Sequence, residues 1–151
     1  NWDELITSSS IIKSLYLCLP KITTEIYLYS LSFTSIQFSK IISSSSNTKR
    51  LIFRFCKIQT EEILTIKQSN FQTKYLSFYN CGGHKTVSMN WDKYPSRFEW
   101  IIKAIYECGM GNNLEGLNIS ETGLEIGIVR EMLGKYGMRY VDVYDKWEDK
   151  P

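Results

Sequence analysis

Three stretches of the chain share one pattern: Thr23-Thr-Glu-Ile26-Tyr-Leu28, Thr48-Lys-Arg-Leu51-Ile-Phe53 and Thr73-Lys-Tyr-Leu76-Ser-Phe78. They begin at 23, 48 and 73, so the interval is constant (48 − 23 = 73 − 48 = 25). Each stretch carries two apolar residues separated by one residue, which is typical of a strand with one buried face. A constant interval of this length predicts repeated units that each supply one strand, with neighbouring strands side by side.

The same frame returns later in the chain, as Leu114-Glu-Gly-Leu117-Asn-Ile119 and Met138-Arg-Tyr-Val141-Asp-Val143. The step from Leu117 to Val141 is similar (141 − 117 = 24), whereas the step from Leu76 to Leu117 is longer (117 − 76 = 41). We place the surplus of the longer step in an insertion over residues 82–95. The sequence therefore predicts one buried ladder with five rungs: Ile26, Leu51, Leu76, Leu117 and Val141.

These residues resemble the leucine-rich-repeat family, whose pattern is L-x-x-L-x-L-x-x-N/C-x-L at a period of roughly 20–29 residues. Cys56 and Cys81 occupy the N/C position, while threonine replaces the leading leucine in three repeats. A unit of about 25 residues is similar to the strand–helix, ribonuclease-inhibitor-like kind of repeat. The resemblance implies an α/β solenoid over residues 23–144, with a parallel concave β-sheet and helices on the convex side. Residues 1–22 would form an N-terminal helical cap or a partial repeat, and 145–151 a polar C-terminal tail that covers the last repeat.

The segments between the strands carry helix signals. We expect helices over residues 60–66, with Thr60 as N-cap, over 95–105, ended by Gly109 or Gly111, and over 124–136. A serine-rich stretch over 35–42 fills the same slot with a weaker helical pattern. Residues 2–19 suit a helix that ends before Pro20.

If the ladder residues face the core, alternating residues face outward on the concave sheet. The side chains predicted to bind a partner there are Tyr27, Tyr29, Arg50, Arg54, Tyr75, Tyr79, Asn118, Tyr140, Asp142 and Tyr144. Tyrosine and arginine are enriched at the energetic centres of protein interfaces. An alternative is that tyrosines occur here because aromatic residues favour strands, or that another repeat or chain covers this face.

The insertion over 82–95 offers a second surface, because insertions in solenoids form loops that often bind partners. Trp91 and Tyr94 would be its anchors. The alternative is a loop whose tryptophan folds back over a helix end.

Several classes of function find little support in the sequence. The 151 residues carry a net charge of +2, too mild for a nucleic-acid-binding stripe. Four cysteines without a CxxC pair fit neither a zinc site nor a disulfide scaffold, which favours an intracellular, cytoplasmic setting with an organelle left open. We expect no membrane-spanning segment, no cofactor, no metal, no small-molecule substrate and no catalytic residue. A thiol enzyme built on Cys81 and His84, the single histidine, is the least favoured alternative.

The sequence thus predicts a protein-interaction module or scaffold subunit, and not an enzyme. Its partners would be proteins, as part of a larger complex. Two alternatives stay open: a structural segment of a longer solenoid, and a substrate-adaptor domain of an enzyme complex.

Overall fold

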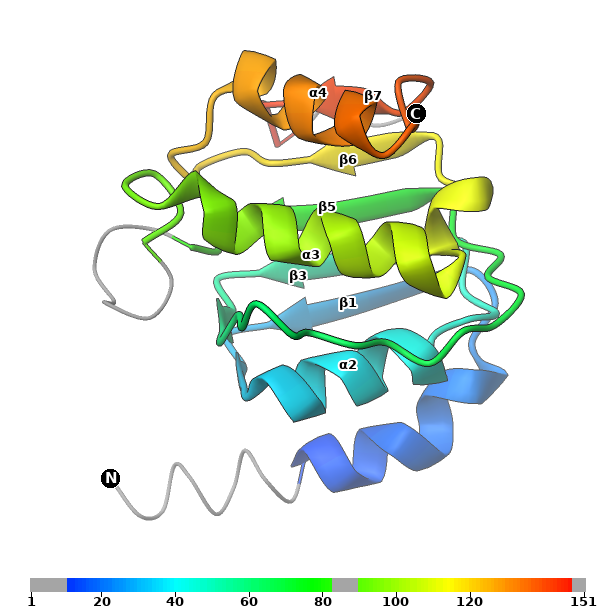
Figure 1. The fold of residues 1–151 in the computed structure, drawn as a ribbon. Helices are drawn as coiled ribbons and strands as arrows, with labels where there is room; N and C mark the ends of the chain where they lie inside the picture. Colours follow the sequence, from blue (N-terminus) through cyan, green and yellow to red (C-terminus); the bar gives the residue numbers. More distant parts are fainter. Residues whose placement is uncertain (1–10, 83–89, 148–151) are drawn as a thin grey trace.

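The computed structural model describes residues 11–82 and 90–147. Five parallel strands form its main sheet in the order β1 (Glu25–Tyr29), β3 (Arg50–Arg54), β5 (Tyr75–Tyr79), β6 (Gly116–Asn118) and β7 (Asp142–Tyr144). Two short strands, β2 (Ser32–Phe33) and β4 (Lys57–Ile58), pair in parallel as a second sheet. The strands of the main sheet lie one above the next in chain order, from β1 at the bottom of Figure 1 to β7 at the top.

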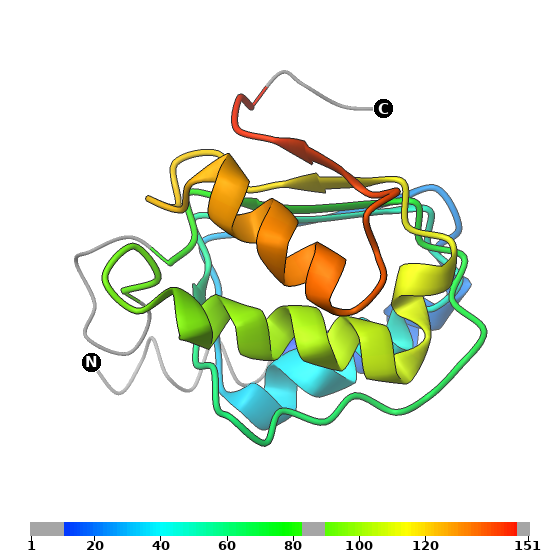
Figure 2. The ribbon, with the colours of Figure 1, turned by 45° about the horizontal axis from the view of Figure 1, so that its top comes forward.

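Helices cover one face of the main sheet. They are α2 (Ser35–Ser44), α3 (Pro95–Cys108) and α4 (Ile126–Lys135), and the figures place all three on the same side (Figures 1 and 2). Residues 11–18 form a further helix, followed by the 3-10 turns η1 (Leu19–Lys21) and, later in the chain, η2 (Met110–Asn112). The fold is therefore α/β with a parallel sheet, as predicted. The sheet is open, and no solenoid curvature is evident in it.

The predicted ladder is confirmed over four rungs and corrected at the fifth. Ile26 pairs with Leu51, Leu51 with Leu76, and Leu76 with Leu117. Leu117 pairs with Val143, however, and not with Val141. Residues 138–141 form a turn in which the Val141 N–H donates to the Met138 carbonyl at 3.2 Å, so the strand starts later than predicted. The shift is two residues, and because side chains alternate along a strand, Asp142 and Tyr144 keep their predicted face.

Local signals explain two of the helices. Thr34 caps α2 with a reciprocal box: its hydroxyl accepts from the Gln37 N–H at 3.1 Å, and the Gln37 side chain accepts from the Thr34 N–H at 3.0 Å. Pro95 begins α3, and Gly109, with φ of 91°, ends it in the left-handed conformation. The helix predicted over 124–136 is α4, which is shorter at both ends.

The helix predicted over 60–66 is wrong. Residues 64–74 contain no helix or strand, and the segment buries Leu64 and Ile66 while Ile63 is 82% exposed. Burial at every second residue is the pattern of an extended chain, and β-branched isoleucine and threonine have low helix propensity. The Thr60 hydroxyl does not cap a helix and is buried without a partner among the described residues.

An aromatic cluster fills the core between the sheet and the helices. Phe53 and Phe78 stack at 5.5 Å with an interplanar angle of 5°, and Phe98 meets the Phe78 ring edge-on at 5.6 Å. Trp91 lies 5.0 Å from Phe98 and is fully buried. A Cβ at Gly82, whose φ is +77°, would lie 2.0 Å from the Trp91 ring, so the chain passes directly over the indole.

Candidate functional site

Figure 2 shows that the helices leave the other face of the main sheet uncovered by helices, and most of the predicted partner-binding residues belong to the strands of this sheet. The strand register places Glu25, Arg50, Tyr75, Gly116 and Asp142 in one row, and Tyr27, Ile52, Ser77, Asn118 and Tyr144 in the next. Tyr29, Arg54 and Tyr79 form a third row where β1, β3 and β5 end. We call this surface the outer face.

The middle of the outer face is closed to solvent. Tyr75, Ser77 and Asn118 are buried there, and Ile52 is buried beside them. The chain after β7 turns back over this surface, since the Asn118 amide Nδ2 donates to the Lys146 carbonyl at 2.9 Å. Residues 145–147 therefore lie on the outer face, and residues 148–151 of the predicted tail lie outside the described residues.

Trp147 continues this path to the third row. Its ring centroid lies 4.5 Å from that of Tyr79 and 6.2 Å from that of Tyr27, in an edge-on contact. The Arg54 guanidinium lies 4.8 Å from the Trp147 ring, within the range of a cation–π interaction. Trp147 thus joins residues of β1, β3 and β5 that are far from it in the sequence.

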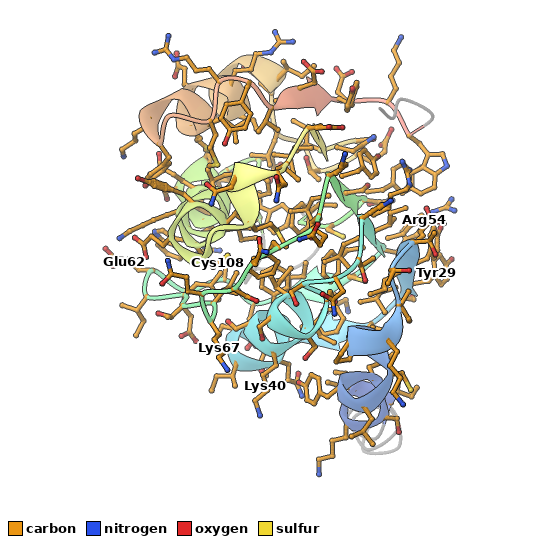
Figure 3. All side chains as sticks on the ribbon, turned by 90° about the vertical axis from the view of Figure 1, so that its right-hand side faces the viewer. Tyr29, Lys40, Arg54, Glu62, Lys67 and Cys108 are labelled. Atoms are coloured by element: carbon orange, nitrogen blue, oxygen red, sulfur yellow. The ribbon has the colours of Figure 1, made fainter. Side chains whose placement is uncertain are left out.

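Arg54 is the centre of an aromatic group that we call the Arg54 cluster, consisting of Tyr27, Tyr29, Arg54, Phe55, Tyr79 and Trp147. Besides Trp147, the guanidinium faces the rings of Tyr79 at 5.0 Å, Phe55 at 5.4 Å and Tyr29 at 5.9 Å. Arg54 Nη1 also donates to the Tyr27 hydroxyl at 2.8 Å. Figure 3 shows Tyr29 and Arg54 side by side, on the opposite side of the molecule from Glu62 and Cys108.

A turn of unusual backbone conformation positions Phe55. Ser30, Phe55 and Asn80 each follow directly after a strand, with φ of 61°, 53° and 50°. Left-handed backbone is uncommon for a residue other than glycine and unfavourable for a bulky one. In Phe55 it presents the ring, which is 38% exposed, edge-on to Tyr29 at 5.6 Å and to Tyr79 at 5.7 Å. The Phe55 N–H donates to the Tyr79 carbonyl at 3.0 Å, which ties this turn to β5.

The cluster is open to solvent at one end and unbalanced in charge. Tyr29 is 57% exposed and Tyr27 43% exposed. Arg50, two rows from Arg54, pairs with Glu25 at 3.2 Å and stacks on Tyr75 at 4.6 Å. No carboxylate of the described residues lies within ion-pair distance of Arg54, and its Nε is buried without a hydrogen-bond partner there. A buried donor without an acceptor is a group that a ligand could satisfy.

The structure brings four of the predicted site residues together and separates others from them. Tyr27, Tyr29, Arg54 and Tyr79 share the Arg54 cluster. Asp142 and Tyr144 lie on β7, at the far edge of the sheet. Tyr140 precedes β7, is 56% exposed, and donates its hydroxyl to the Gly111 carbonyl at 2.6 Å, so it does not belong to the outer face. Tyr75 and Asn118 are buried, and the expectation of exposure is wrong for both.

Trp91 is also in a different place from the one predicted for a surface anchor. Its side chain has no exposed area and packs against Phe78 and Phe98. The structure therefore agrees with the alternative, in which the tryptophan folds back over the start of a helix, here α3. Residues 83–89, half of the insertion, lie outside the described part of the chain.

The three buried cysteines differ in the acidity of their thiols. A hydrogen bond with Cys81 is the largest influence on the Cys56 thiol and lowers its pKa. Burial is the largest influence on the Cys81 side chain and raises its pKa well above the ordinary value, so the thiolate needed for nucleophilic chemistry is disfavoured. Burial likewise raises the pKa of the Cys108 thiol. His84 lies outside the described residues. Within 11–82 and 90–147, no three histidine, cysteine or acidic side chains gather as metal ligands.

A groove lies at the edge of the main sheet formed by β7. This groove of about 650 Å³ runs between α4 and β7, with Leu133, Val141 and Val143 among its lining residues and the basic Arg130 and Arg139 beside them. Asp142 and Tyr144 form backbone hydrogen bonds toward β6. Because bonding alternates along a parallel strand, Val143 presents its N–H and C=O to the free edge.

Comparison with known proteins gives this chain no relative: no protein-family model, curated protein or solved structure matches it. Among the described helices, none has the length and apolar character needed to cross a membrane.

Proposed function

We propose that this chain is a protein-interaction module or scaffold subunit that binds a protein partner through the Arg54 cluster. The observation that carries the proposal is the exposed group of rings around one arginine that has no carboxylate partner among the described residues. Tyrosine, tryptophan and arginine are the residues most enriched at the energetic centres of interfaces. The cluster also lies at the carboxyl ends of parallel strands, where ligands of open α/β sheets usually bind.

We also propose that the sheet is a short solenoid of the leucine-rich-repeat kind. The constant interval between paired residues of β1, β3 and β5 supports it, as does the second ladder of β2 and β4 at the same interval. The left-handed residue after each of the three strands recurs at this interval too. The steps from Leu76 to Leu117 and from Leu117 to Val143 are longer and depart from the repeat.

A structural role within a longer solenoid is the second candidate. The edge of β7, which pairs with no further strand among the described residues, and the groove beside it favour this role, because a further strand and helix would bury both. A substrate-adaptor role remains a proposal with no specific support in the described residues. The intracellular setting remains a prediction from the cysteine pattern.

The proposal is tested with the tagged chain and its Tyr27→Ala/Tyr79→Ala variant in an extract of the organism's own cells. Quantitative mass spectrometry should find proteins that the wild type captures and the variant loses. Tyr106→Ala/Tyr136→Ala is the matched control, because it likewise removes one exposed and one half-buried tyrosine, both outside the cluster. Equal recovery by the two double variants would contradict binding through the Arg54 cluster, provided that both fold.

A further inference from the structure

We infer that the Arg54 cluster binds a partner segment in which an aromatic side chain is followed by carboxylates, and that Trp147 occupies this site in the free chain. The inference rests on the proposed function and adds the chemistry of the partner. Its first support is the position of Trp147, whose ring contacts Tyr79, Tyr27 and Arg54 on three different strands.

Trp147 packs on the surface of the sheet as a bound ligand would, and not as a residue of the core. Its side chain is half-buried, and it does not belong to the hydrophobic core that α2, α3 and α4 form with the sheet. It lies on the other side of the sheet from that core, at the end of a short segment after β7. Removing this ring would therefore open the cluster without opening the core.

The aromatic part of the motif follows from the surfaces that Trp147 covers. The indole packs on the Tyr79 ring at 4.5 Å with an interplanar angle of 53°, and on the Arg54 guanidinium at 4.8 Å. A ring and a guanidinium in this arrangement offer dispersion and cation–π attraction to any aromatic side chain. A partner that displaces Trp147 therefore needs a ring to recover these contacts.

The acidic part follows from Arg54. Arg50 and Arg54 each have one buried nitrogen without a hydrogen-bond partner among the described residues. They differ in their ion pairs, because Arg50 has a carboxylate partner in Glu25, whereas Arg54 forms a hydrogen bond with the Tyr27 hydroxyl and no ion pair with a described carboxylate. Guanidinium groups bind carboxylates with two parallel hydrogen bonds, so a carboxylate is the natural complement of the remaining donors. The chain itself has the combination in sequence, because Glu148 and Asp149 follow Trp147.

The strained turn at Phe55 is consistent with a binding site. A phenylalanine with φ of 53° is held in an unfavourable conformation, and such strain is concentrated at sites of function. Here the conformation gives the cluster a ring between Tyr29 and Tyr79 that a relaxed turn would not place there.

The test uses a fluorescein-labelled peptide with the sequence of residues 144–151, Tyr-Asp-Lys-Trp-Glu-Asp-Lys-Pro, and fluorescence anisotropy. The full-length Trp147→Ala variant, with its site vacated, should bind this peptide on the order of tenfold more tightly than the wild type. The reason is that a side chain on a short tether competes at an effective concentration near millimolar. Equal affinity for the two chains, or no binding to the variant, would overturn the inference.

Two further arms separate the parts of the motif. Peptides with Trp147→Ala, or with Glu148→Gln/Asp149→Asn, should bind the Trp147→Ala chain more weakly than the parent peptide. Adding Arg54→Met to that chain should abolish binding. Arg97→Met is the control and should not, although Arg97 also stacks on a tyrosine, Tyr94, at 4.5 Å. An unchanged affinity with the amide peptide or with Arg54→Met would refute the acidic part.

Circular dichroism checks that each variant folds. If Trp147→Ala does not fold, the wild-type chain and its Arg54→Met variant are titrated at higher peptide concentration. The wild type should then bind the peptide and Arg54→Met should not. The outcomes also separate this inference from the proposed function. If partner capture depends on Tyr27 and Tyr79 but the peptide does not bind, the interaction surface stands and the proposed motif is wrong.

Discussion

Replacing Trp91 with alanine tests whether this residue belongs to the core or to a binding surface. The indole is fully buried between Phe78 and Phe98, at centroid distances of 5.9 Å and 5.0 Å. Truncating a buried tryptophan to alanine typically costs about 3–5 kcal/mol. Trp91 Nε1 has no partner among the described residues, so the substitution also removes an unsatisfied donor worth about 1 kcal/mol or more. We therefore expect a loss near the lower end, about 3 kcal/mol.

The loss in the free energy of unfolding can be measured as a decrease in the melting temperature. An unfolding entropy of about 2.1 cal/mol/K per residue gives about 0.3 kcal/mol/K for the 151 residues. A loss of about 3 kcal/mol then lowers Tm by about 10 °C, which urea unfolding followed by circular dichroism checks independently.

Trp91→Phe is the matched control, because it keeps an aromatic ring in the core while it removes the donor and only part of the buried volume. Its loss should be about 1 kcal/mol or less. The reasoning fails if Trp91→Ala melts with the wild type. It fails more specifically if that variant keeps full stability and loses partner capture, since Trp91 would then be the surface anchor that the sequence first suggested.

Three further predictions concern the core, a helix cap and the thiols. Leu76→Asp buries a charge in the ladder and should lower the free energy of unfolding by about 4 kcal/mol or more. Its control is Leu17→Asp, at a side chain 78% exposed, which should change that free energy by no more than about 0.5 kcal/mol. Similar urea midpoints for the two variants would show that the register is wrong. Thr34→Ala removes the capping box of α2 and should lower the free energy of unfolding by about 1 kcal/mol. Thr65→Ala, outside any helix, is the control, and equal stability of the two variants would argue against the cap. Iodoacetamide should modify exposed Cys18 in the native chain well before Cys81 and Cys108. Because burial raises the pKa of Cys81 and Cys108, the unfolded state loses their protons first as pH rises, so these two thiols should lower the free energy of unfolding above about pH 8.5, while the lowered pKa of Cys56 acts in the opposite direction. Cys81→Val should reduce this dependence of stability on pH, and Cys18→Ala should not. Rapid labelling of Cys81 in the native chain would instead favour the alternative of a thiol enzyme.

The ladder could be predicted because a constant interval and an alternating apolar pattern both survive in the sequence. The last rung was misplaced because Val141 and Val143 satisfy the same pattern, and only the turn after α4 decides between them. The extended segment after β4 was missed for a related reason. Its acidic residues and Thr60 resemble a helix start, but the buried pair Leu64 and Ile66 fits an extended chain along the core.

The candidate site was predicted only in part. Alternation along the strands placed Tyr27, Tyr29, Arg54 and Tyr79 on one face, since this depends on local geometry. Phe55 was missed because its left-handed conformation depends on a hydrogen bond to β5, and Trp147 because the path of the tail depends on tertiary contacts. A tryptophan in an otherwise polar tail was the one signal available, because such a side chain gains free energy by finding an apolar surface.

Every proposal made for the outer face requires five strands side by side in one register. Methyl–methyl nuclear Overhauser effects in a chain labelled at isoleucine, leucine and valine measure this arrangement directly. We predict connections from Ile26 to Leu51, Leu51 to Leu76, Leu76 to Leu117, and Leu117 to Val143. Missing connections between successive members of this series, with strong ones to other residues instead, would contradict the sheet and the binding surface derived from it.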